Sequence, residues 1–423
     1  MSAFLQDHST GSTQAWPNPS GGFLFFLGLA AVGAGMGNLV PAVLTTSLKA
    51  TALDPAGATT LLSTVIGISA LWSLLSFPVL GRLSDRTTGR LGRRRPFLLL
   101  GAALFVVGAV LMLIGQSTPV LVLSGIATAL GFSSATVACT AVVADQFAPE
   151  RRGPASAVVG LSLPVGAVAG LFIAQLVAPD LDAMILLPAA IAALGCVAFA
   201  IRLPDARATR REPFGWIDLL RTFWVSPRRR PDFGWAWLSR LMVFLGVAAI
   251  QAYQPFYLIV VLHHPPAEVA NAVFLSTLVL TVMALLFAPL AGKLSDRVGR
   301  RKPFVVAAAV IFAVGLTTAA FATSFGMFLV AVAIVGLGQG AYFAVDIALI
   351  TQLLPDPDNP AKDLGIMNIA STLPSSLIPA IAPAVLAIGA TAASPQNFTA
   401  LFVLGAVAGL VGAVLVLPIR KVS

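Results

Sequence analysis

Two stretches of the chain carry the same motif: Gly81-Arg-Leu-Ser-Asp85-Arg86-Thr-Thr-Gly-Arg-Leu-Gly92-Arg-Arg-Arg-Pro96-Phe97 and Gly292-Lys-Leu-Ser-Asp296-Arg297-Val-Gly299-Arg-Arg-Lys-Pro303-Phe304. Six residues separate Asp85 from Gly92 in the first copy, and two residues separate Asp296 from Gly299 in the second. A polar motif that recurs at such a distance indicates that the chain consists of two similar halves.

The composition places almost the whole chain in a membrane. Of the 423 residues, 58% are hydrophobic and 10% are charged, whereas about a quarter of the residues of a soluble protein are charged. This excludes most soluble enzymes and nucleic-acid-binding proteins, even though the net charge is +9. Cys139 and Cys196 fall inside apolar runs and the three histidines form no cluster, so we expect neither a metal site nor a cofactor.

Twelve apolar runs are long enough to cross a bilayer as helices, which takes about 20 residues each. They cover 22–47, 59–80, 97–115, 119–143, 154–177, 183–203, 235–262, 268–291, 304–323, 327–353, 364–389 and 398–418. One motif copy follows the second run and the other follows the eighth. We therefore predict an all-α integral membrane protein with twelve transmembrane helices in two pseudo-symmetric six-helix bundles.

The prediction divides the chain into five parts, which are a tail (1–21), the first bundle (22–203), a linker (204–234), the second bundle (235–418) and a second tail (419–423). In the linker, Trp216, Leu220 and Trp224 recur at helical spacing, with charged residues between them. This pattern is typical of a short helix lying on the membrane surface.

The basic residues give the orientation of the chain. Of its 26 lysines and arginines, all except Lys49 and Arg240 fall in the even-numbered loops, the linker and the C-terminal end. Because loops rich in Lys and Arg stay in the cytoplasm, we expect these loops and both termini to be cytoplasmic. We expect the chain to be a multi-pass protein of the cell membrane.

The repeated motif resembles the cytoplasmic signature loop of the major facilitator superfamily, Gly-x-Leu-x-Asp-Arg-x-Gly-Arg-Arg-Lys. The resemblance implies that Asp85 and Asp296 help to latch the cytoplasmic side when the protein faces outward. It assigns a cytoplasmic gate to the motif residues and to an aspartate at the end of span four: Gly81, Asp85, Arg86, Asp145, Gly292, Asp296 and Arg297. We expect the two glycines to allow close helix approach and Asp145 to pair with Arg86.

The longer first copy, from Ser84 to Phe97, resembles the loop of the sucrose and other glycoside–proton symporters of this superfamily. The resemblance implies a sugar as solute and a proton as coupling ion. The chain departs from that branch in span four, where those symporters carry an arginine after the cysteine. Here the pattern reads Cys139-Thr140-Ala141, followed by Asp145, which puts sucrose itself in question.

Two other functions stay open at this stage. One is proton-driven efflux of drug-like or metabolite solutes, although Leu163-Pro164-Val165-Gly166 in span five does not reproduce the Gly-Pro-x-x-Gly-Gly element of the drug–proton antiporters. The other is a sensor or receptor that transports nothing, although the chain has no room for a soluble signalling domain.

Two charged residues fall well inside the predicted spans: Arg240 in span seven and Asp346 in span ten. Each costs about 2.5–3.5 kcal/mol at the bilayer centre unless it finds a partner or faces a cavity. Both lie toward the same side of the membrane at similar depth, so we expect an ion pair. Such a pair would either lock the helices or couple transport to protons, and Asp346 is the expected proton carrier.

Uncharged polar side chains also recur within the spans. Gln339 and Tyr342 share a face of span ten with Asp346, and span eleven carries a stripe of Asn368, Ser371, Thr372 and Ser375. We predict a substrate cavity lined by Asn38, Gln251, Gln254, Gln339, Tyr342, Asn368 and Thr140. Hydroxylated solutes suit such donors and acceptors, although each residue alone could also hydrogen-bond between helices.

The sequence therefore predicts a secondary transporter rather than an enzyme. No ATP-binding loop is present, so an ion gradient or the solute's own gradient must drive transport. We expect proton-coupled movement of a small polar solute, a sugar or glycoside, by alternating access about a site near the midplane. The expected partners are this solute, the proton and the lipid bilayer, without nucleic acid, and the expected state is a monomer.

Overall fold

The computed structural model describes residues 21–205, 230–265, 267–353, 360–390 and 396–420, and all regular secondary structure in these ranges is helical. Twelve helical spans in these ranges are long and apolar enough to cross a membrane. The predicted all-α class and the twelve spans are thus confirmed. The surface helix expected near Trp216 lies outside the described residues, as does nearly all of the N-terminal tail.

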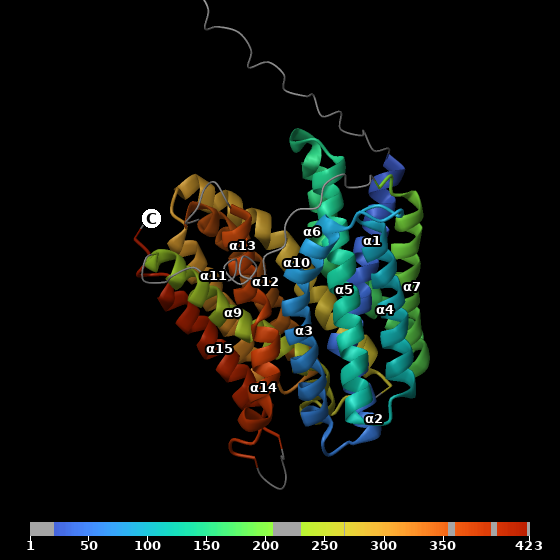
Figure 1. Ribbon diagram of the computed structural model, residues 1–423. Helices are drawn as coiled ribbons and strands as arrows, with labels where there is room; N and C mark the ends of the chain where they lie inside the picture. Colours follow the sequence, from blue (N-terminus) through green and yellow to red (C-terminus); the bar gives the residue numbers. More distant parts are fainter. Residues whose placement is uncertain (1–20, 206–229, 266, 354–359, 391–395, 421–423) are drawn as a thin grey trace, which may run out of the picture.

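The first half contains six of the twelve spans, and Figure 1 shows their helices in blue to green. Its helices are α1 (Gly21–Val40), η1 (Pro41–Thr45), α2 (Thr46–Leu53), α3 (Ala58–Arg86), α4 (Arg95–Ile114), α5 (Thr118–Gln146), η2 (Pro149–Arg151), α6 (Arg152–Leu176) and α7 (Leu181–Arg202). The first span consists of α1, η1 and α2. In this half α1 packs against α6 and α7, while α4 packs against α5 and α7.

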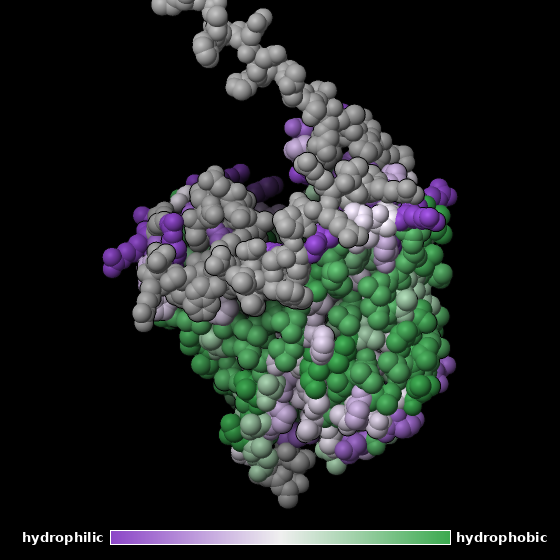
Figure 2. All heavy atoms as spheres, in the orientation of Figure 1, coloured by the Kyte–Doolittle hydropathy of each residue, from purple (hydrophilic) through white to green (hydrophobic). Residues whose placement is uncertain are grey.

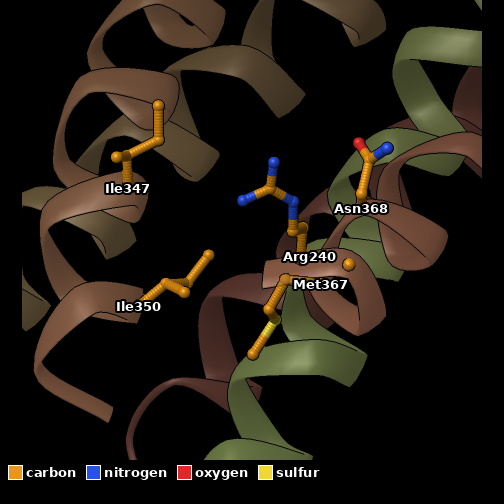
Figure 3. Close-up of a pocket in the computed structure, with 6 residues that line it drawn as sticks. Arg240, Ile347, Ile350, Met367 and Asn368 are labelled. Atoms are coloured by element: carbon orange, nitrogen blue, oxygen red, sulfur yellow. The ribbon is translucent and has the colours of Figure 1, made fainter. Parts of the chain in front are cut away.

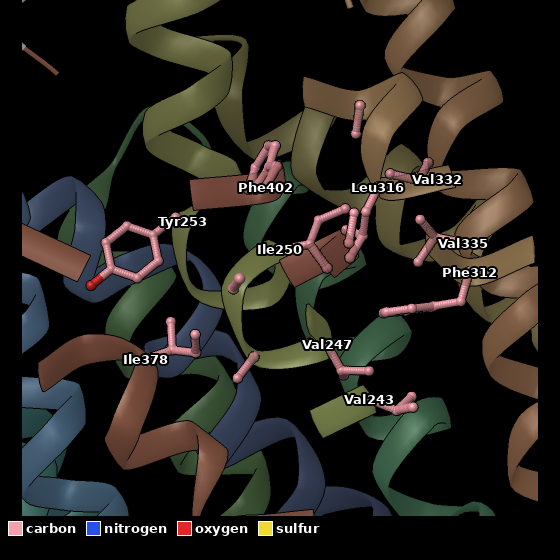
Figure 4. Packing of buried hydrophobic residues seen from close by; sticks show 14 of the residues in the cluster. Val243, Val247, Ile250, Tyr253, Phe312, Leu316, Val332, Val335, Ile378 and Phe402 are labelled. Atoms are coloured by element: carbon pink, nitrogen blue, oxygen red, sulfur yellow. The ribbon is translucent and has the colours of Figure 1, made fainter. Parts of the chain in front are cut away.

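The second half repeats this arrangement. Its helices are α9 (Pro231–Phe256), η3 (Tyr257–Val261), α10 (Val269–Val298), α11 (Lys302–Ala320), α12 (Phe325–Leu353), α13 (Pro360–Thr372), α14 (Pro374–Leu386) and α15 (Phe398–Leu415). Here α12 packs against α10 and α11, and α15 packs against α9 and α11. Figure 4 shows the apolar core between these helices, with Val247, Phe312, Val335 and Phe402 among its members.

The outer surface is apolar, as the composition requires. Figure 2 shows a broad hydrophobic band around the visible face, with hydrophilic residues gathered at both ends. Large apolar side chains in this chain are fully open to the surroundings, such as Ile201 (70% exposed) and Leu194 (67% exposed). In water this surface would aggregate, so the surrounding medium is lipid.

We call the side of the membrane that carries Asp85 and Asp296 the motif side. The two halves are joined mainly on the opposite side. There a hydrogen bond links Ser63 of α3 to Tyr253 of α9, and the Gln396 amide donates to the Thr59 hydroxyl at 3.0 Å. On the motif side, the described ion pairs of Asp85 and Asp296 each stay within one half.

Glycines set how closely α12 approaches its neighbours. A Cβ atom at Gly340 would lie 2.2 Å from the backbone oxygen of Ala284 in α10, and one at Gly338 would lie 2.5 Å from the backbone nitrogen of Phe312 in α11. The close approach expected at the two motif glycines is wrong for this conformation. A Cβ atom at Gly81 meets nothing within 4 Å, and one at Gly292 meets only Ala344, at 3.8 Å, because no neighbouring helix packs closely there.

We expect Gly340→Ala to lower stability, because the added methyl group forces α12 and α10 apart at a cost of about 1–3 kcal/mol. The matched control is Gly160→Ala in α6, where a Cβ atom meets nothing within 4 Å and alanine improves helix propensity by about 1 kcal/mol. Thermal unfolding of the purified protein in detergent measures both. Equal melting temperatures for the two variants would contradict the packing described.

Candidate functional site

The two intramembrane charges are in direct contact. Nη1 of Arg240 on α9 donates to Oδ2 of Asp346 on α12 at 2.6 Å. The two side chains are 15% and 5% exposed. The ion pair expected from the sequence is therefore present, and it joins the first and the fourth span of the second half.

Two further contacts fix the Arg240 guanidinium. Its Nε donates to the Ser371 hydroxyl on α13 at 2.6 Å, and its central carbon lies 5.3 Å from the centre of the Phe244 ring. Phe244 in turn stacks on Phe343 of α12, with ring centres 5.1 Å apart. One guanidinium thus joins three helices, through a carboxylate, a hydroxyl and an aromatic face.

Ser371 is a site residue that the sequence analysis does not single out. It belongs to the polar stripe of span eleven, three residues after Asn368, and that spacing is the only signal it gives. Nothing in the sequence tells which hydroxyl of the stripe faces Arg240, because that depends on the rotation of α13 about its axis.

A cavity of about 450 Å³ opens beside the ion pair. It is lined by Arg240, Ile347, Ile350, Gly365, Met367 and Asn368 (Figure 3). The Arg240 side chain extends between Ile347 on one wall and Asn368 on the other (Figure 3). The cavity therefore offers a cation, an amide and apolar walls within reach of one small molecule.

Buried polar atoms without partners continue along α12. Gln339 and Tyr342 are 7% and 0% exposed, yet Oε1 of Gln339 and the Tyr342 hydroxyl lack a hydrogen-bond partner among the described residues. The Tyr342 hydroxyl lies near Ser239 and Asp346 without bonding geometry to either. Because an unpaired buried polar group costs about 1–3 kcal/mol, these atoms mark positions that a water or a polar solute would satisfy.

The other predicted cavity residues lie apart from the Arg240 cavity. Asn368 is the one member of the predicted set that lines it. Gln254 is buried, whereas Thr140 and Gln251 are exposed and Asn38 is half-buried. Gln251 follows Arg240 by eleven residues, which is about 16 Å along α9. The prediction placed polar residues from several depths in one site. Helical spacing shows that residues share a face of a helix, but it does not show that they line the same pocket.

A second cluster of charges lies in the first motif copy, around Arg94. This side chain is 4% exposed. Its Nε donates to Asp145 at 2.7 Å, and its Nη1 lies 2.8 Å from Asp85 and 2.7 Å from the Ser84 hydroxyl. Burial lowers the pKa of the Arg94 guanidinium, but Asp145 and Asp85 raise it by more, so the pKa lies above its ordinary value.

Arg94 corrects one expectation from the sequence. The sequence predicts that Asp145 pairs with Arg86, but in the structure Asp145 forms its ion pair with Arg94. Arg94 immediately precedes α4 and lies between the ends of α3 and α5, where it reaches both carboxylates. Asp205, just after α7, accepts from the backbone N–H groups of Arg94 and Arg95 at 2.6 and 2.8 Å, so it caps α4 at the same point.

The second motif copy repeats this geometry, with fewer bonds among the described residues. Arg301 pairs with Asp296 at 2.6 Å and contacts the Ser295 hydroxyl at 3.5 Å. Gly92 and Gly299 both have left-handed φ angles, of 93° and 69°, which glycine adopts without strain. The match of aspartate, serine, arginine and glycine shows that the sequence repeat is also a structural repeat.

Comparison with known proteins agrees with this repeat. The sequence matches the model of the family described as Major Facilitator Superfamily over residues 20–287 and 274–423. A 118-residue segment is 33% identical to Multidrug resistance protein MdtL of Shewanella sp. (strain ANA-3). That segment spans 28% of this chain and 27% of that relative, so it covers only about a quarter of either protein.

Two solved structures share the fold over nearly the whole chain. A mutant of the nucleoside transporter NupG has a TM-score of 0.73 at 12% identity, covering 94% of this chain and 100% of that one. The D-xylose-proton symporter has a TM-score of 0.72 at 16% identity, covering 94% and 97%. At these identities the likeness concerns the fold alone.

The ion pair makes a testable prediction. Arg240→Ala and Asp346→Ala each leave a buried charge without its partner, which costs about 3–5 kcal/mol. The double variant removes both charges, so its loss of stability should be clearly smaller than the sum of the two single losses. Thermal unfolding of the four proteins in detergent gives this comparison. Additive losses would count against a direct interaction.

Proposed function

This chain belongs to the major facilitator superfamily and is a transporter rather than an enzyme, and from that premise we propose that it couples the movement of a small polar solute to protons. The proposed mechanism is alternating access. The proposed solute is a sugar or glycoside. The protein works as a monomer in the cell membrane, with both termini and the motif side in the cytoplasm.

The observation that carries the proposal is the contact between Arg240 and Asp346 at the edge of a cavity. Asp346 is nearly inaccessible and has a cation as its partner, so its protonation changes the net charge beside the cavity by one unit. A protonated Asp346 loses the charge attraction to Arg240 and holds the guanidinium less strongly, so the guanidinium can move to contact a solute. Proton uptake and solute binding are linked in this way through one side chain.

The class of solute follows from the polar atoms nearby. The Asn368 amide and the Arg240 guanidinium offer donors and an acceptor in the cavity lining, and the unpaired atoms of Gln339 and Tyr342 lie deeper along α12. A solute with several hydroxyl groups can bond to the lining atoms, whereas an apolar solute would leave them unpaired. The fold shared with a xylose–proton symporter is compatible with this solute class.

The alternative function is proton-driven efflux of a drug-like or metabolite solute. Two observations favour it: the segment similar to Multidrug resistance protein MdtL, and the apolar walls that Ile347, Ile350 and Met367 give to the cavity. A solute with an apolar body and one polar group would fit these walls.

Uptake into proteoliposomes separates the two functions. Radiolabelled monosaccharides, glycosides and nucleosides are offered with an imposed proton gradient in either direction, and empty liposomes serve as the control. The proposal is supported if an inward proton gradient drives accumulation of a sugar in the vesicles and a protonophore abolishes that accumulation. No sugar uptake, together with proton-driven expulsion of apolar cations such as ethidium, would support efflux instead.

The proposed gate consists of Asp85 and Asp296, with Gly81, Arg86, Asp145, Gly292 and Arg297 around them. Asp85 and Asp296 are each bonded to an arginine of their own half, so their ion pairs among the described residues do not join the two halves. The halves are held together by Ser63, Tyr253, Thr59 and Gln396 on the other side. We assign this conformation to the state that is open toward the cytoplasm.

Asp346→Asn should abolish solute accumulation driven by a proton gradient, while exchange of labelled for unlabelled solute continues. The asparagine keeps the size and a hydrogen-bonding group but cannot take up a proton. The measurement is proton flux, followed with a pH-sensitive dye inside the vesicles, alongside solute flux. Asp346→Glu, which keeps the carboxyl group, is the control. Proton flux in unchanged ratio to solute flux in the Asn variant would remove Asp346 from the proposed role.

Asp85→Asn should lower the maximal transport rate severalfold and change solute affinity little, because the residue lies at the gate and not at the cavity. Initial rates over a range of solute concentrations give both quantities. The control is Asp54→Asn, at an exposed aspartate on the other side whose Oδ1 caps the Gly57 amide at 3.0 Å, a bond that asparagine retains. A loss of affinity at constant maximal rate would argue against gating by Asp85.

A further inference from the structure

Span eleven is not one helix but two. Its first part, α13, ends at Thr372, and its second part, α14, begins at Pro374. Proline has no N–H group, so the carbonyl of Ala370 receives no backbone hydrogen bond from four residues later. The regular pattern ends with the Leu373 amide, which donates to Ile369 at 2.9 Å, and it resumes with the Leu377 amide, which donates to Leu373 at 3.1 Å. Pro379 and Pro383 lie further along the span, but α14 continues past both of them, so the interruption between α13 and α14 is the point at which we expect the span to bend.

The two parts of span eleven belong to different surroundings. α14 packs extensively against α3 of the other half, where a Cβ atom at Gly67 would lie 3.3 Å from Pro379. α13 makes few contacts with α3, and both parts pack against α9, where the Trp237 indole donates to the Ile366 carbonyl of α13 at 2.9 Å. The two parts thus differ in their packing on the first half, which is extensive for α14 and slight for α13.

The cavity side of α13 carries the contact to the ion pair. Gly365, Met367 and Asn368 line the cavity, and the Ser371 hydroxyl, one turn before the bend, accepts from Nε of Arg240. The same guanidinium donates to Asp346 of α12 through Nη1. Arg240 therefore spans from the ionisable carboxyl to the part of span eleven that is free to bend.

We propose that Ser371 is a positioning residue that transmits the charge state of Asp346 to α13. The inference rests on the proposed function for its role in transport. A charged Asp346 holds the guanidinium in place, and the guanidinium holds α13 through Ser371. Loss of the charge on Asp346 weakens one of these two bonds, because a neutral group accepts less strongly from a guanidinium than a carboxylate does. The guanidinium then shifts, and α13 turns about Leu373 and Pro374 toward α3.

No other described carboxyl on these helices is placed to do the same. Asp232 on α9 and Asp363 on α13 each lie eight residues from Arg240 and Ser371, which is about 12 Å along a helix. Asp232 accepts from the backbone of Arg420, and Asp363 is buried near the start of α13. On α12, the helix that faces Arg240, Asp346 is the one charged residue in the described range.

Hydrogen exchange tests the link without any transport measurement. Ser371→Ala should raise the exchange rates of the α13 amides about tenfold, because a hydrogen bond to a charged group is lost, and leave those of α14 unchanged. Ser371→Thr keeps the hydroxyl and should behave as the parent protein does. The matched control is Thr372→Val, which removes a hydroxyl that bonds only to carbonyls of its own helix.

The dependence on Asp346 is tested by combining variants. Asp346→Asn should raise α13 exchange to a similar extent, and Ser371→Ala added to it should raise the exchange little further, because both changes act through one guanidinium. The inference is overturned by unchanged α13 exchange in Ser371→Ala, by an equal effect of Thr372→Val, or by additive effects of Ser371→Ala and Asp346→Asn.

A flux measurement connects the link to transport. In proteoliposomes, Ser371→Ala should lower the ratio of protons to solute moved at least twofold, and Ser371→Thr should restore it. A parent ratio of zero for every solute would refute proton coupling, and the exchange experiment would still decide the role of Ser371. A normal ratio in Ser371→Ala, measured with a coupled parent protein, would overturn the transmitting role.

Discussion

A guanidinium and a carboxylate within a lipid-embedded protein are tolerated only as partners, and the contact between Arg240 and Asp346 organises the second half around that requirement. The pair fixes the rotation of α9 and α12, because both side chains must point at one another. The remaining nitrogen atoms of the guanidinium need partners as well, and Ser371 supplies one of them. Three helices are thereby set in register by one side chain, and the cavity forms at their junction.

The two halves have divided their tasks although they share a fold. The first half has its charges at the motif side, where Arg94 binds Asp85 and Asp145 and Asp205 caps the start of α4. That network ties the ends of α3, α4, α5 and α7 together. Among the described residues, the second half has fewer bonds at its motif, through Arg301 and Asp296, and it carries instead the intramembrane pair. The charged contacts of the two halves thus lie at different depths in the membrane.

Proline marks where the spans can bend. Pro374 divides span eleven, and the π-helical turns η1 and η3 lie at corresponding places in spans one and seven, beginning at Pro41 and just after Pro255. Such π-helical turns are rare and occur frequently at functional sites. The halves are held together on the side where η1 and η3 lie, by the bonds from Ser63 to Tyr253 and from Gln396 to Thr59. The π-helical turns thus lie on the same side of the membrane as the hydrogen bonds between the halves.

The sequence by itself determined the class, the number of spans, the two halves and the identity of the charged pair, because hydropathy and charge act along the chain and each intramembrane charge had one available partner. It could not determine which arginine meets Asp145, since Arg86 and Arg94 are both near and only the position of Arg94 between α3 and α5 places it on both carboxylates. The tertiary structure also decided that Asn368 shares the cavity of Arg240 while Gln251 does not, and that Ser371 bonds to the guanidinium. These outcomes depend on helix rotation and on packing distances of a few ångströms, which are fixed by contacts between residues far apart in the chain and leave no periodic signal within it.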